Sequence, residues 1–223
     1  MILAVTGGKG GVGKSTVAYN LGAELDAVVV DADLGMADLP TGRGPDLHDV
    51  LAGRATAVEA VREDGPVDLL PCGRSLAGAR SVEPRRLVDC VESVEREYGT
   101  VLVDCPAGLG SDVGLPLLVA DACVLVTTPD RVALADAVRA RALARELDAG
   151  LVAVALNRAD GSSPTDGVEQ TFGAPVVPVP ERPAVAHGMA NGLPARRVDG
   201  DDVAGVAFAD LAERVRSVLV NSF

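Results

Sequence analysis

The segment from Gly8 to Ser15 has the composition and spacing of a phosphate-binding loop. It reads Gly-Lys-Gly-Gly-Val-Gly-Lys-Ser, which matches the pattern G-x-x-x-x-G-K-[ST]. Glycines let backbone N–H groups turn toward phosphate oxygens, and the helical pattern that follows presents the positive end of its dipole there. We expect Lys14 to reach the β- and γ-phosphates and the Ser15 hydroxyl to bind Mg²⁺. The predicted nucleotide-binding loop is Gly8, Lys9, Gly10, Gly11, Val12, Gly13, Lys14, Ser15 and Thr16.

Lysine is used in this chain only inside that loop. Lys9 and Lys14 are its two lysines, and every other basic side chain is an arginine. A compact ammonium at these positions suits phosphate chemistry better than a surface role does. The general phosphate-loop pattern specifies Lys14 but leaves the residue at Lys9 open, so Lys9 is either a second phosphate ligand or a solvated loop lysine.

Acidic and amide side chains follow several short apolar runs. Asp31 and Asp33 come after the run that starts at Val28, Asp104 ends the run that starts at Val101, and Asn157 follows Leu151–Leu156. If these runs are parallel strands, their carboxyl ends meet at one edge of a sheet, where ligands bind. Because Asp31 and Asp33 are two residues apart, their side chains point the same way. A purely structural sheet has no need for carboxylates there.

The periodicity of the chain predicts how these side chains are positioned. Short β-branched runs alternate with helical stretches, which is typical of a mostly parallel sheet covered on both sides. The expected strands are Ile2–Thr6, Val28–Asp31, Val67–Leu70, Val101–Asp104, Cys123–Thr127, Leu151–Leu156 and Val176–Val179. The expected helices are Ser15–Leu25, Leu47–Leu51, Val58–Arg62, Pro84–Glu97, Asp112–Val119, Val132–Leu147 and Val203–Val220. We therefore predict an α/β fold of three layers, α/β/α, formed by residues 1–223 as a single domain.

Three segments together resemble the MinD/ParA family of P-loop ATPases, whose phosphate loop is a deviant Walker A motif. They are KGGVGKS at 9–15, VVDADLGMADL at 29–39 and VLVDCPAG at 101–108. The resemblance extends over nearly the whole chain and is greatest to the MinD branch. It implies the P-loop fold, ATP and Mg²⁺ as cofactors, and an ATP-dependent homodimer in which Lys9 reaches the nucleotide of the partner subunit.

The resemblance also implies roles for the acidic residues and for two switch positions. Asp33 would orient the attacking water, Asp31 would lie near the magnesium shell, and Asp104 would hold Mg²⁺ through water. The catalytic residues would then be Lys9, Lys14 and Asp33, and the metal residues Ser15, Asp31 and Asp104. Asp38 and Gly108 would belong to the two segments that respond to the γ-phosphate, although family members commonly have Asn in place of Asp38.

The same resemblance predicts that two later segments contact the base of the nucleotide. Asn157-Arg158 is similar to the family's adenine-contacting segment, and an Asn amide can both donate to and accept from a base edge. Pro180 and Glu181 lie in a stretch similar to the loop that closes over the base. The stretch from Ala190 to Pro194 resembles the family's A-x-x-G-x-P segment, for which we expect a structural role.

Composition indicates what the core is made of and argues against DNA-binding, disulfide and metal-binding functions. The chain has 223 residues, a net charge of −12 and only 2% aromatic residues, so its core is built from aliphatic side chains. The acidic balance argues against a general DNA-binding surface. Cys72, Cys90, Cys105 and Cys123 form no metal or disulfide pattern and are expected to be buried thiols, while His48 and His187 are isolated and expected to be ordinary polar positions.

No segment reads as a signal peptide or a membrane span, so a cytoplasmic location is expected, with membrane contact only at the periphery through a partner. The stretch from Leu211 to Phe223 has no lysine and no aromatic anchor beyond Phe223 itself, which argues against the lipid binding of bacterial MinD proteins. The function predicted is a slowly hydrolysing ATPase that acts as a dimerisation switch with a protein activator, positioning division, motility or sensory machinery. Two alternatives stay open: a ParA-like DNA partition ATPase, and an ATP-binding adaptor with little hydrolysis.

Overall fold

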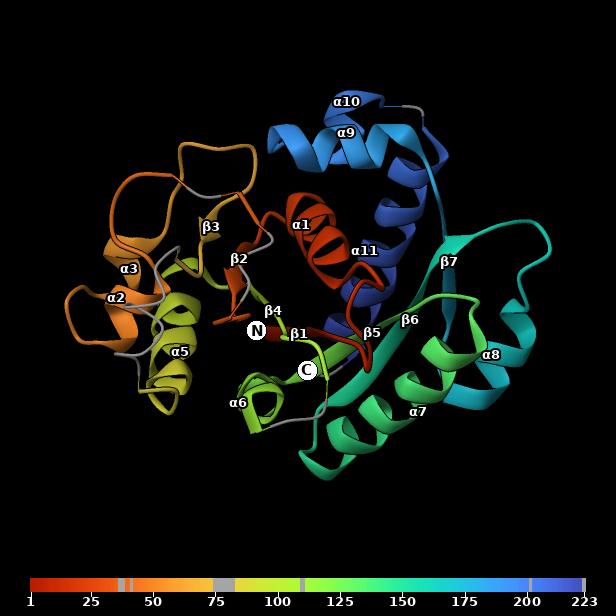
Figure 1. Cartoon of the computed structure of the whole chain (residues 1–223), viewed down its shortest axis with the longest axis horizontal. Coiled ribbons are helices and arrows are strands. Elements are labelled where there is room, and N and C mark those ends of the chain that lie inside the picture. The colour runs from red at the N-terminus through yellow and green to blue at the C-terminus, as the bar shows by residue number, and fades with distance from the viewer. Residues whose placement is uncertain (36–38, 41, 74–82, 109–110, 201, 222–223) are drawn as a thin grey trace.

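The computed structural model describes residues 1–35, 39–40, 42–73, 83–108, 111–200 and 202–221. Its centre is one sheet of seven strands in the order β3-β2-β4-β1-β5-β6-β7, and every neighbouring pair is parallel (Figure 1). The strands are β1 Ile2–Thr6, β2 Val28–Asp31, β3 Leu69–Leu70, β4 Val101–Asp104, β5 Ala122–Thr127, β6 Gly150–Ala159 and β7 Val176–Pro180. The predicted parallel α/β fold is confirmed.

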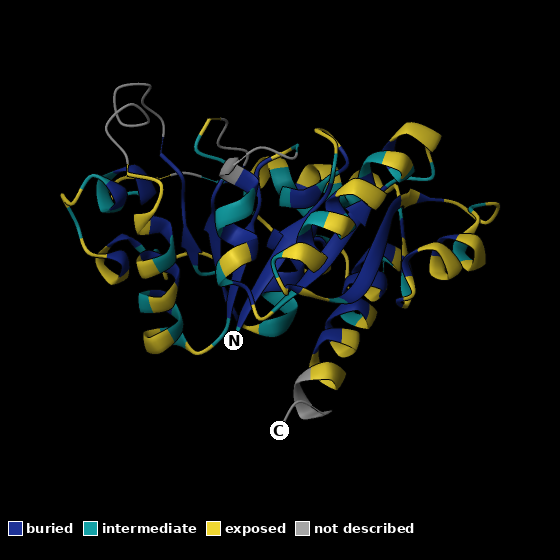
Figure 2. Ribbon diagram, turned by 90° about the horizontal axis from the view of Figure 1, so that it is seen from below, coloured by how far each residue is buried: buried dark blue, intermediate teal, exposed yellow. Residues whose placement is uncertain are grey.

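Helices cover both faces of this sheet. They are α1 Lys14–Leu25, α2 Leu47–Leu51, α3 Ala57–Ala60, α5 Arg86–Tyr98, α6 Ser111–Val119, α7 Arg131–Glu146, α8 Thr165–Phe172, α9 Pro183–Asn191, α10 Ala195–Val198 and α11 Val203–Asn221. In Figure 2 the buried strands lie between helices whose outer faces are exposed. The three layers expected from the sequence are therefore present, and all seven predicted helices have a counterpart.

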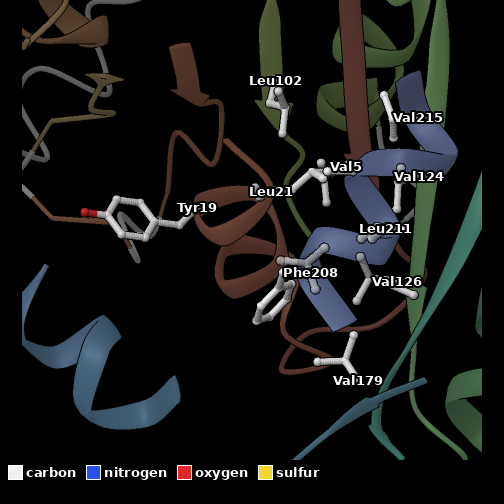
Figure 3. Close-up of a cluster of buried hydrophobic side chains, with 14 of the residues drawn as sticks. Val5, Tyr19, Leu21, Leu102, Val124, Val126, Val179, Phe208, Leu211 and Val215 are labelled. Carbon is white, nitrogen blue, oxygen red and sulfur yellow. The ribbon is translucent and has the colours of Figure 1, made fainter. Parts of the chain in front are cut away.

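The alternation of side chains along β1 shows how the two cores form. Leu3 and Val5 pack into the cluster beneath α1 and α11, whereas Ile2 and Ala4 pack into the cluster on the opposite face. Because both faces are covered, β1 has apolar residues from Ile2 to Val5 without a break, and its last residue is the buried Thr6. Figure 3 shows the first cluster, with Phe208 of α11 lying among aliphatic side chains from the strands.

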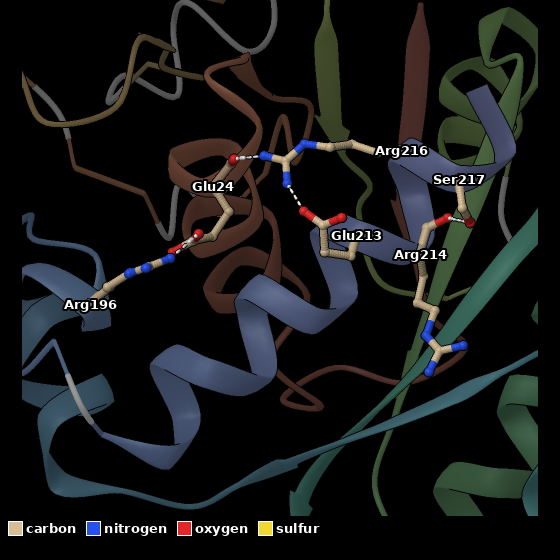
Figure 4. A network of polar contacts seen from close by, with 6 residues as sticks. All are labelled: Glu24, Arg196, Glu213, Arg214, Arg216 and Ser217. Atoms are coloured by element: carbon tan, nitrogen blue, oxygen red, sulfur yellow. Dashed lines mark hydrogen bonds and ion pairs between the residues drawn. The ribbon is translucent and has the colours of Figure 1, made fainter. Parts of the chain in front are cut away.

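Polar contacts fasten the last helices to the C-terminal end of α1. Arg196 of α10 pairs with the Glu24 carboxylate at 2.8 Å, and Arg216 of α11 donates to the Glu24 backbone carbonyl and pairs with Glu213 (Figure 4). These contacts are partly exposed, so each contributes little to stability by itself. Together they fix the angle at which α10 and α11 meet the helix that follows the phosphate loop.

Among the described residues, three helices were not predicted, and several predicted bounds were wrong. Helices α8, α9 and α10 were missed, and β3 covers only Leu69–Leu70 of the predicted Val67–Leu70. The helix predicted to reach Arg62 ends at Ala60, because Val61 is extended and Arg62 forms an antiparallel bridge with Leu69. Strand β6 runs past its predicted end to Ala159, which carries Asn157 within the sheet.

Candidate nucleotide site

The glycine-rich loop joins the carboxyl end of β1 to the first turn of α1. Gly13 caps α1 with φ of 96° and makes no side-chain capping bond, so the first N–H groups of the helix are left for a ligand. Gly11 also has a positive φ, 77°, which L side chains rarely adopt. Lys14 begins the helix and is only 7% exposed. The loop from Gly8 to Ser15 thus turns on two glycines with positive φ directly before α1.

Close contacts leave no space for a side chain at Gly8 or Gly13. A Cβ on Gly8 would lie 2.0 Å from the backbone oxygen of Asp136 in α7, and one on Gly13 would lie 2.2 Å from Nδ2 of Asn157. Both distances are far below van der Waals contact, so the loop is pressed between α7 and β6. By contrast, the nearest described atom to a Cβ on Gly10 is 3.8 Å away, in Ala107. That contact places the phosphate loop beside the segment after β4.

Asn157 supports the loop from the neighbouring strand. Its Nδ2 donates to the Val12 carbonyl at 2.8 Å, and its Oδ1 accepts from the Arg158 amide at 3.0 Å. Asn157 is 9% exposed and Arg158 has a positive φ of 55°. The sequence assigned Asn157 to the base and did not predict its hydrogen bond to Val12, because no spacing pattern links two positions that are 145 residues apart.

Two carboxylates lie side by side at the rim of the sheet. Asp31 of β2 and Asp104 of β4 are direct neighbours in the strand register, and they are 0% and 1% exposed. Burying like charges together is costly unless a cation compensates them. Ser15 follows Lys14 in the first turn of α1, above the same rim. Oxygen ligands of this kind fit Mg²⁺ as a cofactor bound through water and phosphate oxygens.

Among the described residues, no group of three or more His, Cys, Asp or Glu side chains is arranged to hold a metal ion by itself. A magnesium ion bound here would therefore depend on the nucleotide and on water for part of its coordination, as is usual for Mg²⁺ at phosphate sites. Cys105, next to Asp104, is buried, and that burial raises the pKa of its thiol, so it acts as a small packed side chain.

Asp33 lies in a turn just beyond β2. Its amide donates to Asp31 Oδ1 at 3.2 Å, and its own Oδ1 accepts from the Gly35 amide at 3.3 Å. The turn orients the carboxylate while leaving it partly accessible. Gly108, predicted as a switch position, has φ of 102°. Asp38, the other predicted switch residue, lies outside the described residues.

Lys9 points toward α7. Its Nζ lies 3.8 Å from Oδ1 of Asp130, and the two side chains are 47% and 57% exposed. Asp130 is the N-cap of α7; hydrogen bonds from the Ala133 and Val132 amides and the charge of Lys9 lower the pKa of its carboxyl. An exposed pair at this distance is weak, so Lys9 can leave Asp130 at little cost.

The predicted base-binding residues line one cavity of about 160 Å³. It is bounded by Gly13 and Thr16 on the phosphate-loop side, by Asn157 and Arg158 from β6, and by a third group from the end of β7, the two residues after it and α9. That third group is Pro180, Glu181, Arg182, Val185, Ala186 and Met189. The structure thus brings all four predicted base residues together beside the phosphate loop. A larger groove of about 640 Å³ lies elsewhere, near Arg62 and the loop at 42–45.

Contacts from α1 hold the α9 wall of this cavity in place. The Tyr19 hydroxyl donates to the Gly192 carbonyl at 2.7 Å, and Asn20 Oδ1 accepts from the Ala195 amide at 2.6 Å. Asn20 Nδ2 also lies 4.0 Å from Sδ of Met189. Helix α1 therefore holds the backbone at Gly192 and Ala195, in and directly after the segment from Ala190 to Pro194, through two side chains that were not predicted.

Comparison with known proteins agrees with this geometry. The family model described as the CobQ/CobB/MinD/ParA nucleotide binding domain matches residues 3–195. An uncharacterized ATP-binding protein of Methanocaldococcus jannaschii is 31% identical over 96% of this chain and 86% of its own length. The septum site-determining protein MinD of Synechocystis is 32% identical over 70% of this chain and 64% of its own length.

Solved structures give the same result. The cell division ATPase MinD of Pyrococcus furiosus is similar with a TM-score of 0.90 and 30% identity, over 97% of this chain and 98% of that chain. The septum site-determining protein MinD of Pyrococcus horikoshii, solved with Mg-ADP, has a TM-score of 0.90 and 29% identity, over 98% and 96%. By its phosphate loop, its fold and these similarities, the chain belongs to the MinD/ParA family of nucleotide-binding proteins, and within it is most like MinD.

Proposed function

We propose that this protein binds Mg-ATP at the carboxyl ends of β1, β2 and β4, dimerises face to face around two nucleotides, and hydrolyses ATP slowly. The observation that carries the proposal is the convergence of an open phosphate loop with two buried, adjacent carboxylates and a third at Asp33. The Mg-ADP bound to the MinD of Pyrococcus horikoshii supports the same ligand class here.

Each residue has a physical task in this proposal. The N–H groups of the loop from Gly8 to Thr16 surround the phosphates, and Lys14 compensates their charge from a nearly buried position. Ser15, Asp31 and Asp104 would hold Mg²⁺, which supplies charge compensation for the β- and γ-phosphates when bound. Asp33 would orient water toward the γ-phosphate. Asn157, Arg158, Pro180 and Glu181 would enclose the base.

The position of Lys9 supports the dimerisation part of this proposal. In this structure Lys9 lies on the exposed rim against Asp130 of its own chain, not over its own phosphate loop. An ammonium on the rim can reach phosphate oxygens of a facing subunit, in the manner of an arginine finger. Hydrolysis would remove the γ-phosphate that both subunits hold, and would thereby release the dimer.

The Lys9→Met variant tests this directly. In sedimentation with Mg-ATP we expect the wild-type protein to form dimers and Lys9→Met to remain monomeric, because the charge that crosses the interface is lost. ATP affinity of the monomer should change less than about tenfold, since the side chain is half exposed. The control is Asp130→Asn, which frees Lys9 and should dimerise at least as well as wild type. Nucleotide-dependent dimers of Lys9→Met would show that Lys9 does not act across an interface.

The cellular role proposed is the positioning of a large complex, such as division, motility or sensory machinery, with a protein partner that accelerates hydrolysis. The similarity to septum site-determining proteins of Synechocystis and Bacillus subtilis supports this class of role. No helix in the described part of the chain is long and apolar enough to cross a membrane. We propose that the protein acts in the cytoplasm and contacts a membrane only through a partner.

A further inference from the structure

Two side chains far from the phosphate loop hold the backbone that follows Asp33. The Cys72 thiol donates to the Asp33 carbonyl, with 3.1 Å between Sγ and the oxygen. His48 Nε2 lies 3.3 Å from the Leu34 carbonyl oxygen. A carbonyl oxygen can only accept, so Nε2 must carry the proton of the imidazole. Two consecutive carbonyls are thus each held by a different side chain.

The fold places this pair by cross-linking three segments. Strand β3 pairs with β2, which brings Cys72, two residues past β3, next to the turn at Asp33. His48 is the second residue of α2, and α2 is itself tied to the same segment: the Leu47 amide donates to the Pro71 carbonyl at 2.8 Å, and the His48 amide to the Cys72 carbonyl at 3.1 Å. The pair therefore sits on a rigid frame.

The pair is buried and closely packed. His48 is 4% and Cys72 is 1% exposed, and their Nε2 and Sγ atoms are 3.5 Å apart. Gly73 has φ of 116°, and a Cβ there would lie 2.6 Å from His48 Nδ1. Nδ1 itself is buried with no hydrogen-bond partner in the described part of the chain. Nε2, on the other side of the ring, faces the Cys72 thiol and the turn that follows Asp33.

The contact at Nε2 bears on Asp33 through the peptide to which the Leu34 carbonyl belongs. The same peptide carries the Gly35 N–H group, which donates to Asp33 Oδ1 at 3.3 Å. When His48 fixes the carbonyl, it also fixes the direction of this N–H group, because the peptide is planar. The preceding peptide, which carries the Asp33 carbonyl, is fixed by Cys72. The orientation of the Asp33 carboxylate therefore depends on both buried side chains.

We propose that His48 and Cys72 are positioning residues that orient the Asp33 carboxylate through the peptides at Asp33–Leu34 and Leu34–Gly35. The proposal rests on the role of Asp33 in hydrolysis given above. Cys72 acts as a protonated donor and not as a nucleophile: burial, with the charges of Asp31, Asp33 and Asp46, raises the pKa of its thiol. Neither side chain touches the nucleotide in this account.

Two pairs of variants of the full-length protein separate hydrogen bonding from packing. His48→Met removes the donor, whereas His48→Gln keeps an N–H group near the position of Nε2. Cys72→Ala and Cys72→Ser form the equivalent pair. We expect His48→Met and Cys72→Ala to lower single-turnover hydrolysis of ATP about tenfold, the kinetic equivalent of one lost hydrogen bond. Mg-ATP affinity should stay within about twofold, and His48→Gln and Cys72→Ser should recover most of the rate.

Amide hydrogen exchange gives a second readout that does not depend on turnover. The Leu34 and Gly35 amides should exchange faster in His48→Met and Cys72→Ala than in wild type, and at nearly the wild-type rate in the Gln and Ser variants. Cys90→Ala is the matched control, because it removes another buried thiol, from α5. It should change neither hydrolysis nor the exchange of these two amides.

The outcomes are distinguishable. Equal losses in His48→Met and His48→Gln would show that His48 acts only by packing, and wild-type rates and exchange in the Met and Ala variants would overturn the proposal outright. If Asp33→Ala hydrolysed ATP like wild type, the proposed role of Asp33 in hydrolysis would be wrong. The proposal that His48 and Cys72 position Asp33 for that step would then be wrong as well. Differences in exchange between the Met and Gln variants would in that case still establish the hydrogen bonds themselves.

Discussion

Replacing Lys14 by methionine is expected to weaken Mg-ATP binding on the order of 10³-fold without destabilising the nucleotide-free protein. The ammonium would make charge-assisted bonds to two phosphates, and the loss of two such bonds amounts to about 4 kcal/mol. In the absence of nucleotide the same ammonium is nearly buried, at 7% exposure, and desolvation of a charge is costly. We therefore expect the free energy of unfolding of the apo variant to equal or exceed that of wild type.

Titration calorimetry and chemical unfolding of the same samples check both halves of this prediction. Lys9→Met is the matched control, because it removes the chain's other lysine from an exposed position and should leave nucleotide binding to the monomer largely intact. A Lys14→Met protein that bound Mg-ATP within tenfold of wild type would place the phosphates somewhere other than this loop.

Removal of the Asp33 carboxylate should separate dimerisation from hydrolysis. In Asp33→Ala we expect single-turnover hydrolysis to fall on the order of 10²-fold or more, since the group that orients the water is lost. ATP binding and ATP-dependent dimerisation should persist, because neither the loop nor Lys9 is altered. The variant would therefore accumulate as a dimer that releases its nucleotides slowly.

Rapid quench of pre-bound, radiolabelled ATP measures this step, and sedimentation of the same variant reports the dimer. Asp64→Ala is the control: it removes an equal charge from an exposed loop outside the candidate site. Equal hydrolysis in Asp33→Ala and wild type would favour an adaptor that binds ATP without using this carboxylate. Loss of dimers in Asp33→Ala would instead show that Asp33 maintains the interface.

The sequence was most informative where structure is determined locally. The phosphate loop, strands β1, β2 and β4, and the position of the carboxylates at their ends follow from glycine chemistry and from unbroken apolar runs. The edge strand β7 was also predicted, although it contains Pro178 and Pro180. Proline has no backbone N–H group to donate, and a strand at the edge of a sheet tolerates this.

The missed helices had no local signal of this kind. In α9 the one buried residue is Gly188, and its apolar contact with the core is limited to the partly buried Val185 and Met189, so the apolar stripe in the sequence is short. Helix α10 has only four residues. Helix α8 buries Val168 and Phe172, one turn apart, within eight residues that include a glycine. These helices form where they do because α1, α7 and the sheet offer surfaces to pack on, and a sequence pattern does not contain those surfaces.

The same limit applies to the candidate site. The residues that would touch phosphate and magnesium were predicted, whereas their supports were not. Asn157 was assigned to the base, but it also braces the phosphate loop through Val12. His48 was expected to be an ordinary polar position, yet it is buried against the turn at Asp33. Contacts between distant segments depend on how β2, β3 and β6 are arranged in the sheet, which spacing along the chain does not specify.

The central claim is that the loop at Gly8–Ser15 and the neighbouring strand ends form a site for Mg-ATP. Isothermal titration of the purified, full-length protein with ATP, in the presence and absence of Mg²⁺, tests it most directly. We expect saturable binding of one nucleotide per chain that weakens strongly without Mg²⁺. Absence of any heat of binding and of any nucleotide-dependent rise in unfolding temperature, at millimolar Mg-ATP, would contradict it.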